Sequence, residues 1–170
     1  MSQHQTAQSA ALARAFSQFT SGVTIVTAAS GGATCGMTAS SFTSLSVDPP
    51  LVLLCLGNAT RTLDAVKRSQ HFAVSVLAEH HSCLAQGFAG TAPERWAPFE
   101  HYDWRGGSTG APVLEDSLAW FDCRLAATHQ GGDHSIVVGE VVDFGSNPRA
   151  RPLLYGNRTW RTVEQSPLSL

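Results

Sequence analysis

The sequence predicts a mainly β protein, an antiparallel barrel with a few flanking helices. Short apolar and β-branched runs recur along the chain and are typical of strands. Glycine or proline pairs at 31–32, 49–50 and 131–132 separate these runs and favour tight turns between them. Helical spacing is limited to a few short segments. Many strands, frequent turns and few helices together indicate an antiparallel barrel.

Length and composition indicate one globular domain. The 170 residues suffice for one well-buried core and are few for two. With 43% hydrophobic and 14% charged residues, the chain is neither a disordered nor a coiled-coil sequence. We therefore expect a single domain over residues 1–170, with its core at about 11–161 and flexible tails at 1–8 and 163–170.

Charge, cysteines and targeting signals exclude several classes of protein. A formal net charge of −2 without a basic cluster argues against a nucleic-acid partner and against membrane-surface binding. We expect no signal peptide, and the longest apolar run, 51–56, is far shorter than the roughly 20 residues that span a bilayer. The four cysteines lie far apart without a C-x-x-C pair, so we expect no metal site and a reducing, cytoplasmic location.

The first part of the chain predicts a helix followed by a hairpin. Helical spacing begins near Ser9, and Gly22 ends the helix. Residues 23–27 are β-branched and predict a strand, and the turn at 31–32 leads into a second strand at 35–40. The apolar residues at helical spacing are Leu12, Ala15, Phe16 and Phe19.

The middle of the chain predicts two strands and a short helix. A strand at 42–47 ends at the proline pair, and the apolar run 51–56 predicts a buried central strand. Asn58 or Thr60 can cap the helix that follows. The inward residues of that helix are Leu63, Ala65 and Val66.

The second half predicts a strand, a helix, a long loop and four more strands. Residues 89–111 contain glycines, prolines and tryptophans without a clear period, which indicates a functional loop. The expected elements are a strand at 72–77, a helix at about 79–88, long strands at 118–128 and 135–144 joined through 131–133, and a last pair around 153–155 and 159–160.

The stretch 36–50 is the first candidate binding site. Six hydroxyl side chains and no charge precede Asp48, and they surround Met37 and Phe42. Small side chains let a ligand approach the backbone N–H groups. This pattern suits a flat ligand with polar edges, and the alternative is an ordinary edge strand with a Ser/Thr turn.

Residues 58–62 form the second candidate, a phosphate site at the start of the predicted helix. A helix N-terminus offers free N–H groups and partial positive charge. The hydroxyls of Thr60 and Thr62 and the guanidinium of Arg61 would complete the site. The alternative is an ordinary capped helix with a solvated Arg61.

His134 is the third candidate, in a turn after two glycines. Asp133 can orient or charge its imidazole, and a histidine beside a cleft can hydrogen-bond an amide or carry a proton. The alternative is a plain hairpin turn. His80 and His81 would point about 100° apart on a helix, so we expect no shared metal ion. Because no G-x-G-x-x-G motif occurs, nicotinamide binding would need a fold other than the Rossmann fold.

Taken in order, these segments resemble the short-chain flavin reductase family, FMN-binding split-barrel proteins that serve as reductase components of two-component monooxygenases. The resemblance covers about residues 11–161. Each segment alone is weak evidence, whereas their order and spacing together are specific. The segments are 19–27 (FTSGVTIVT), 36–46 (GMTASSFTSLS), 48–51 (DPPL), 61–62 (RT), 72–77 (FAVSVL), 132–134 (GDH) and 152–155 (PLLY).

The resemblance implies a fold, an activity and partners. The implied fold is a six-stranded Greek-key split barrel with flanking helices, in a homodimer that binds flavin near the subunit interface. The implied activity is that of an NAD(P)H:flavin oxidoreductase, which transfers a hydride from NADH or NADPH to FMN or FAD. The reduced flavin would pass to a partner monooxygenase or halogenase.

The resemblance also implies positions for both cofactors. His134 would lie at the nicotinamide site, oriented by Asp133, with Tyr155 near it. The residues implied in flavin binding are Met37, Thr38, Ala39, Ser40 and Ser41 along the ring and ribityl chain, Cys55, Leu56, Gly57, Arg61 and Thr62 at the phosphate, and Phe88 and Ala89 beside the flavin.

Segment 156–160 departs from the family, which commonly has a histidine, a glycine turn and a tyrosine after PLLY. Gly156 or Asn157 tolerates a positive φ, so the turn can still form. Two other functions stay open. One is a flavin carrier or storage module without fast NAD(P)H turnover, and the other is a binder of a non-flavin ligand, such as haem or a pyridoxal derivative, on the same barrel.

Overall fold

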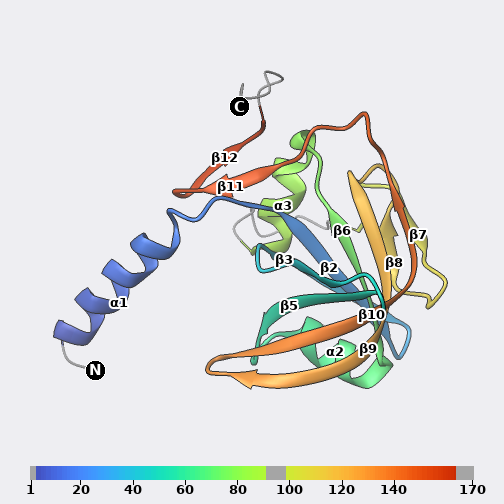
Figure 1. The fold of residues 1–170 in the computed structure, drawn as a ribbon, viewed down its shortest axis with the longest axis horizontal. Helices are drawn as coiled ribbons and strands as arrows, with labels where there is room; N and C mark the ends of the chain where they lie inside the picture. The colour runs from blue at the N-terminus through green and yellow to red at the C-terminus, as the bar shows by residue number, and fades with distance from the viewer. Residues whose placement is uncertain (1–2, 91–98, 164–170) are drawn as a thin grey trace.

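The structure, a computed structural model that describes residues 3–90 and 99–163, is built on a seven-stranded antiparallel sheet (Figure 1). The mainly β class with few helices is thus confirmed. The β-branched and apolar runs of the sequence supply the central strands. In spatial order the strands are β3 (Ala33–Ala39), β2 (Thr24–Ser30), β6 (His71–Val76), β9 (Ala119–Gly131), β10 (His134–Ser146), β5 (Leu51–Gly57) and β4 (Thr43–Ser46).

The two edge strands of this sheet, β3 and β4, are consecutive in the chain. Residues 40–42 join them directly, so the sheet curls back on itself. Ser41 also links this connection to β5, because its hydroxyl donates to the carbonyl of Cys55 at 3.1 Å and accepts from the N–H of Cys55 at 2.9 Å. The described sheet has seven strands where the sequence led us to expect six.

Two smaller sheets lie outside the main one. The order β1-β11-β12 joins β1 (Ser21–Gly22), β11 (Leu154–Gly156) and β12 (Thr159–Arg161), which confirms the predicted terminal pair. β7 (Trp104–Gly106) pairs with β8 (Pro112–Leu114). The predicted loop 89–111 is therefore wrong over β7, and its residues 91–98 lie outside the described residues.

The helices differ from the sequence prediction at their ends. α1 (Gln3–Phe16) begins before Ser9 and ends before Phe19, so the helix includes residues 3–8. α2 (Arg61–Ser69) is capped by Thr60 as predicted. The single helix expected at 79–88 is divided into a 3-10 turn, η1 (Glu79–His81), and α3 (Ser82–Phe88). Within the described residues, no helix is both long and apolar enough to cross a membrane.

Apolar packing fixes α2 and α3 beside β3. Leu63 and Val66 of α2 are fully buried in a cluster with the sheet residue Phe72, while Leu84 of α3 is buried in a second cluster with Ile25. Burying each such side chain stabilises the fold by about 1.5–3 kcal/mol. Both helices contact β3, so the start of α2 and the end of α3 stand over the same edge strand.

Candidate functional site

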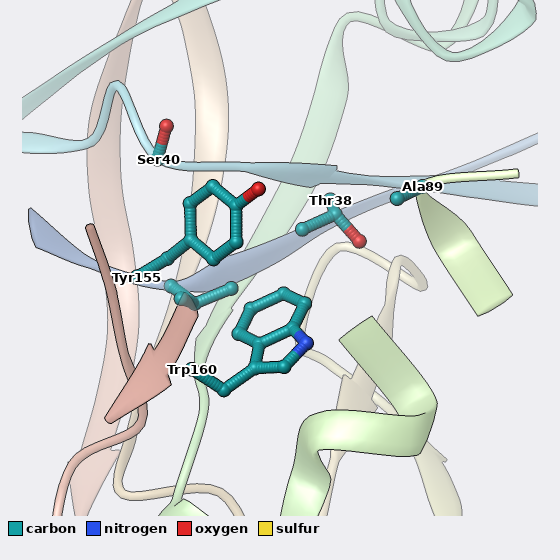
Figure 2. Close-up of a pocket in the computed structure, with 6 residues that line it drawn as sticks. Thr38, Ser40, Ala89, Tyr155 and Trp160 are labelled. Carbon is teal, nitrogen blue, oxygen red and sulfur yellow. The ribbon is translucent and has the colours of Figure 1, made fainter. Parts of the chain in front are cut away.

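Two hollows follow one another along β3. The first, the α2 cavity, has a volume of about 450 Å³ and is lined by residues 34–37, residues 59–62, Phe88 and Phe99. The second, the Trp160 pocket, has a volume of about 210 Å³ and is lined by Val23, Thr38, Ser40, Ala89, Tyr155 and Trp160 (Figure 2). The two hollows share no lining residue, although Thr38 follows Met37 and Ala89 follows Phe88 in the chain.

The start of α2 offers an anion site at one end of the α2 cavity. The Thr60 hydroxyl accepts from the N–H of Leu63 at 3.3 Å and donates to the carbonyl of Gly57 at 2.8 Å, so it is engaged within the chain. The amides of Arg61 and Thr62 have no carbonyl within the helix to donate to. Both residues line the cavity, and the positive helix end and the exposed Arg61 guanidinium favour an anion there.

An aromatic wall faces the α2 cavity. The ring of Phe88 lies 5.1 Å from that of Phe99 and 5.8 Å from that of Trp104, measured between centroids. A Cβ at Gly36 would come within 2.7 Å of the Phe88 ring, so glycine at this position lets the ring lie close to β3. The ring planes of Phe88 and Phe99 meet at 81°, so the pair forms an apolar corner, and a planar ligand can pack against the face of one ring.

The Trp160 pocket is built by the β11–β12 hairpin. Tyr155 and Trp160 are cross-strand partners whose ring centroids lie 4.6 Å apart, and Figure 2 shows both rings beside Thr38. The turn uses positive φ at Asn157 (48°) and Arg158 (59°), as a tight hairpin requires. A Cβ at Gly156 would overlap Thr20, which explains a glycine at the first position of the departing segment.

The three hydroxyl residues predicted to contact the ligand from the stretch 37–41 have different roles. Thr38 donates to the carbonyl of Ala85 at 2.6 Å, and Ser41 is bonded to the backbone of Cys55. Ser40 is exposed and lines the Trp160 pocket, and its hydroxyl has no hydrogen-bond partner in the described part of the chain. Ser40 is therefore the hydroxyl most available to a ligand.

Several predicted flavin contacts lie in or behind the core. Ala39 is 7% exposed, and its carbonyl accepts from Thr24, while Leu56 is fully buried in the sheet. Neither side chain faces a hollow, so only their backbone could meet a ligand. Cys55 is half-buried. Gly57 lies between Thr60 and His134, since a Cβ at this position would be 3.3 Å from the Thr60 side chain and 3.9 Å from Nε2 of His134.

His134 stands at the tip of the β9–β10 hairpin, beside the start of α2. Its Nδ1–H donates to Oδ1 of Asp133 at 2.7 Å, and its side chain is 49% exposed. The hydrogen bond from His134, together with the neighbouring charge, holds the pKa of Asp133 below its usual range. Asn58 ties the hairpin tip to the α2 loop, because its N–H donates to the carbonyl of Asp133 at 2.9 Å.

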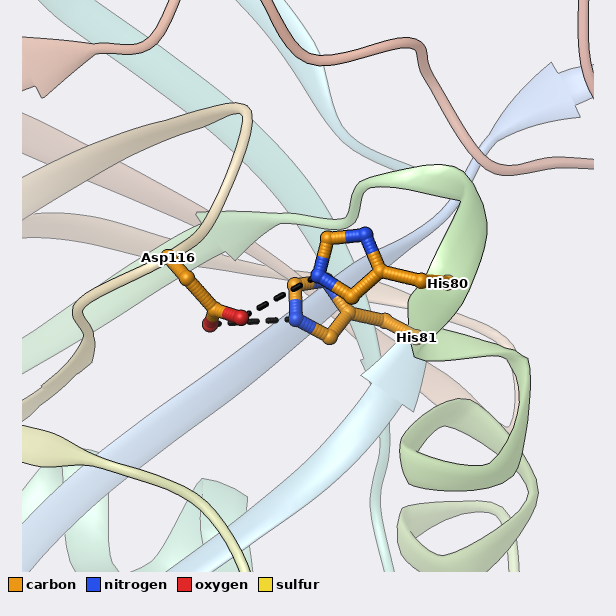
Figure 3. Close-up of side chains that lie close together, drawn as sticks. All are labelled: His80, His81 and Asp116. Atoms are coloured by element: carbon orange, nitrogen blue, oxygen red, sulfur yellow. Dashed lines mark hydrogen bonds and ion pairs between the residues drawn. The ribbon is translucent and has the colours of Figure 1, made fainter.

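A separate cluster brings His80 and His81 to Asp116, contrary to the expectation that the two rings diverge (Figure 3). Each Nε2 lies 3.1 Å from a carboxylate oxygen, although that of buried His81 does not meet hydrogen-bond geometry. Nδ1 of His81 accepts from the N–H of Ala78 at 3.1 Å. The proton of neutral His81 is therefore on Nε2, which disfavours metal binding there.

The structure brings most of the predicted site residues together. Met37, Arg61, Thr62 and Phe88 line the α2 cavity, and Thr38, Ser40, Ala89 and Tyr155 line the Trp160 pocket. His134 lines neither the α2 cavity nor the Trp160 pocket, whereas Tyr155 lines the second.

Sequence reasoning missed Trp160 and Phe99. A two-residue turn at Asn157 and Arg158 would have placed Trp160 opposite Tyr155. Phe99 carries no local signal, since its contact with Phe88 depends on the tertiary fold.

Known proteins resemble this chain in fold and, in sequence, over most of its length. The model of the family described as flavin reductase like domain matches residues 16–164. A relative named probable flavin reductase, from Rhizobium meliloti, is 41% identical over 135 residues, which are 79% of this chain and 42% of that protein. The chain therefore spans about two-fifths of the length of that relative.

Two further relatives match over most of their own length. The reductase subunit HsaB of a flavin-dependent monooxygenase from Mycobacterium tuberculosis is 36% identical over 149 residues, 86% of this chain and 78% of that protein. The FMN reductase (NADH) SmoA from Agrobacterium fabrum is 41% identical over 128 residues, 75% of this chain and 71% of that protein.

Three solved structures match nearly the whole chain. Nitrilotriacetate monooxygenase component B from Mycobacterium thermoresistibile has a TM-score of 0.88 at 33% identity, covering 98% of this chain and 94% of that one. The NADH:FAD oxidoreductase SgcE6 from Streptomyces globisporus scores 0.83 at 36% identity, covering 90% and 92%. BorF, the flavin reductase component of a bacterial two-component tryptophan halogenase, scores 0.84 at 36% identity, covering 93% and 99%.

These matches agree with the site geometry, in which a helix start suited to an anion lines one cavity with an edge strand and aromatic rings. The family model and the relatives above 30% identity both extend over most of the sequence. The chain belongs to the family of flavin reductase like domains.

Proposed function

We propose that this protein is an NADH-dependent flavin reductase, which transfers a hydride from NADH to FMN or FAD. One observation carries the proposal: the α2 cavity joins an anion-binding helix start to an edge strand and an aromatic wall in a chain of this family. Relatives named FMN reductase (NADH) and NADH:FAD oxidoreductase support the choice of cofactors.

The residues of the two hollows fit a flavin. Phe88 and Phe99 offer apolar ring faces to the flavin ring system, and the Ser40 hydroxyl and β3 backbone offer polar contacts to its edge. Arg61 and Thr62 fit the phosphate through their amides and the guanidinium. A charge-assisted hydrogen bond to phosphate is worth about 1.5–3 kcal/mol, so Arg61 alone would change affinity roughly tenfold or more.

The chain positions the reacting groups and stabilises charge. When bound, flavin supplies N5 as the hydride acceptor and NADH supplies the hydride from its nicotinamide ring. The hollows along β3 hold the rings at reacting distance, where alignment lowers the barrier by several kcal/mol. Because β3 is an edge strand, alternate N–H groups of residues 37–39 point away from β2, and together with those of residues 40 and 41 they can stabilise negative charge on reduced flavin.

His134 is the proposed nicotinamide contact, and Asp133 is its positioning residue. The bond from Nδ1–H to Asp133 leaves Nε2 as the ring atom for a ligand. The half-exposed side chain is accessible to NADH. Tyr155 completes the flavin-binding set as part of the Trp160 pocket.

For the topology, we propose a single split-barrel domain. Its six longer strands are arranged as a Greek key, and β4 is a short additional strand. The direct connection between the two edge strands supports this arrangement, as does the bond from Ser41 to β5. The location we propose is the cytoplasm, since all four cysteines are unpaired, as is usual in reducing compartments.

The assembly we propose is a homodimer in which α1 packs against a second copy. In Figure 1, α1 extends away from the sheet. Leu12, Phe16 and Phe19 are 52%, 69% and 81% exposed, and apolar side chains gathered in this way favour an interface. Light scattering after size-exclusion chromatography should give twice the chain mass, and Phe16→Glu should lower it to the monomer. A wild-type monomer would contradict the dimer.

The partner we propose is a separate flavin-dependent monooxygenase or halogenase that receives reduced flavin. Relatives named as reductase components of such systems support this choice. Mixing this reductase with a candidate partner should give NADH-dependent product formation.

The decisive experiment mixes purified protein with NADH and FMN and follows nicotinamide absorbance. We expect NADH oxidation that requires both the protein and the flavin. Flavin binding without NADH oxidation would favour a carrier, and absence of flavin binding would favour another ligand. Either result would overturn the reductase assignment.

A further inference from the structure

A third hollow continues the α2 cavity along helix α2. This arginine groove has a volume of about 260 Å³. One wall is formed by residues 61, 64, 65 and 68 of α2, and the other by Ser30 and residues 33–35 of the β2–β3 hairpin. Thr34, Cys35 and Arg61 line both hollows, so the groove is continuous with the α2 cavity.

The α2 wall of the groove carries two guanidinium groups. Arg61 and Arg68 are seven residues apart and therefore lie on one helix face, about 10 Å apart along the axis. Both are exposed, and none of the ion pairs within residues 3–90 and 99–163 involves either of them. The chain has only 11 Lys and Arg residues, yet three of them are on this nine-residue helix. Of the charged residues that line the groove, Arg61 and Arg68 outnumber Asp64, so the groove is a region of net positive charge in a chain of net negative charge.

We propose that the arginine groove binds the adenylate half of FAD, with Arg68 on its second phosphate. This inference rests on the proposed flavin reductase function. FMN ends at one phosphate, whereas FAD continues through a second phosphate, a ribose and an adenine. With the first phosphate at the start of α2, the groove is the described hollow into which these added groups can extend.

The chemistry of the groove suits each part of an adenylate group. A guanidinium binds phosphate through two parallel N–H donors, so Arg61 and Arg68 can share a diphosphate between them. Asp64 lies between the two arginines and can accept hydrogen bonds from ribose hydroxyls. Ala33 and Ala65 are small residues on opposite walls and leave room for a flat base.

The test compares the dissociation constants of FMN and FAD, measured by flavin fluorescence quenching. In the wild type we expect tighter binding of FAD than of FMN. Arg68→Ala should shift the ratio of the two constants toward FMN by about fivefold to tenfold, because the guanidinium is exposed and partly screened. Lys67→Ala is the matched control, since Lys67 is an adjacent exposed cation that does not line the groove. It should leave the ratio unchanged.

Several outcomes would overturn the groove assignment. An unchanged ratio in Arg68→Ala, or the same shift in Lys67→Ala, would show that Arg68 does not hold the adenylate half. A selective rise in the KM for NADPH, without a change in FAD affinity, would assign Arg68 to the 2′-phosphate of NADPH instead. If one of these results is found and the wild type still reduces FMN with NADH, the groove assignment is wrong and the proposed flavin reductase function stands. If it binds no flavin, the proposed function fails as well.

Discussion

Ser40 and Ser41 are neighbours with opposite expected roles, and Ser41→Ala tests this difference. The antiparallel register pairs Thr43 of β4 with Leu53 of β5. Continued by two residues, the same register would pair Ser41 with Cys55. At that position the Ser41 side chain replaces a backbone pair, bonding the Cys55 carbonyl at 3.1 Å and its N–H at 2.9 Å. Ser41→Ala leaves both backbone groups without this partner.

The expected cost follows from those two bonds. Leaving buried polar groups unsatisfied costs about 1–3 kcal/mol, and the half-buried position of Ser41 favours the middle of that range. For a chain of this size, 1 kcal/mol changes Tm by about 2–4 °C, so we expect Ser41→Ala to lower Tm by about 4–8 °C.

The assay is thermal and urea unfolding followed by circular dichroism, with Ser40→Ala as the matched control. Ser40 is exposed, so its variant should remain within about 0.5 kcal/mol of the wild type. Ser40→Ala should instead weaken FMN binding several-fold, because Ser40 lines the Trp160 pocket and the described residues leave its hydroxyl free for a ligand. Equal stability of the two variants would refute the role given to Ser41.

Three further variants test other parts of the account. Arg61→Ala should weaken FMN about tenfold or more while sparing riboflavin, which lacks the phosphate, and equal losses would make Arg61 structural. His134→Ala should raise the KM for NADH or lower kcat, whereas a loss confined to FMN affinity would move His134 to the phosphate end. Burial lowers the pKa of His81 below its ordinary value of 6.5, against the raising effect of Asp116, while His80 lowers it further. The unfolded chain then binds the extra proton, so the unfolding free energy is complete above pH 6.5 and falls below it. His81→Gln should flatten that fall, and an unchanged pH slope would count against this origin.

The strands were predictable where the local sequence alone decides the structure. Residues 24–27 and 51–56 form strands as expected, because a β-branched or continuous apolar run favours an extended, buried chain. β7 was not predictable, since residues 104–106 become a strand only by pairing with β8. The break before α3 likewise depends on the His81 ring, which accepts the N–H of Ala78.

The candidate site likewise has parts that the local sequence predicts and parts that depend on the tertiary fold. Thr60 is a residue type that favours the N-cap of a helix, so the start of α2 was predictable from the sequence. Arg61 and Thr62, the next two residues, line the α2 cavity. Composition could not distinguish Ser40 from Ser41, because the difference depends on which hydroxyl meets β5. The aromatic wall also remained hidden, since Phe88 and Trp104 meet only in the folded chain.

A crystal structure of the protein with FMN would show where the flavin binds. We expect the flavin along β3, with its phosphate within hydrogen-bond reach of the amides of Arg61 and Thr62 and its ring beside residues 37–40. A phosphate bound instead at the hairpin tip 132–134, or a ring that does not touch β3, would contradict this placement.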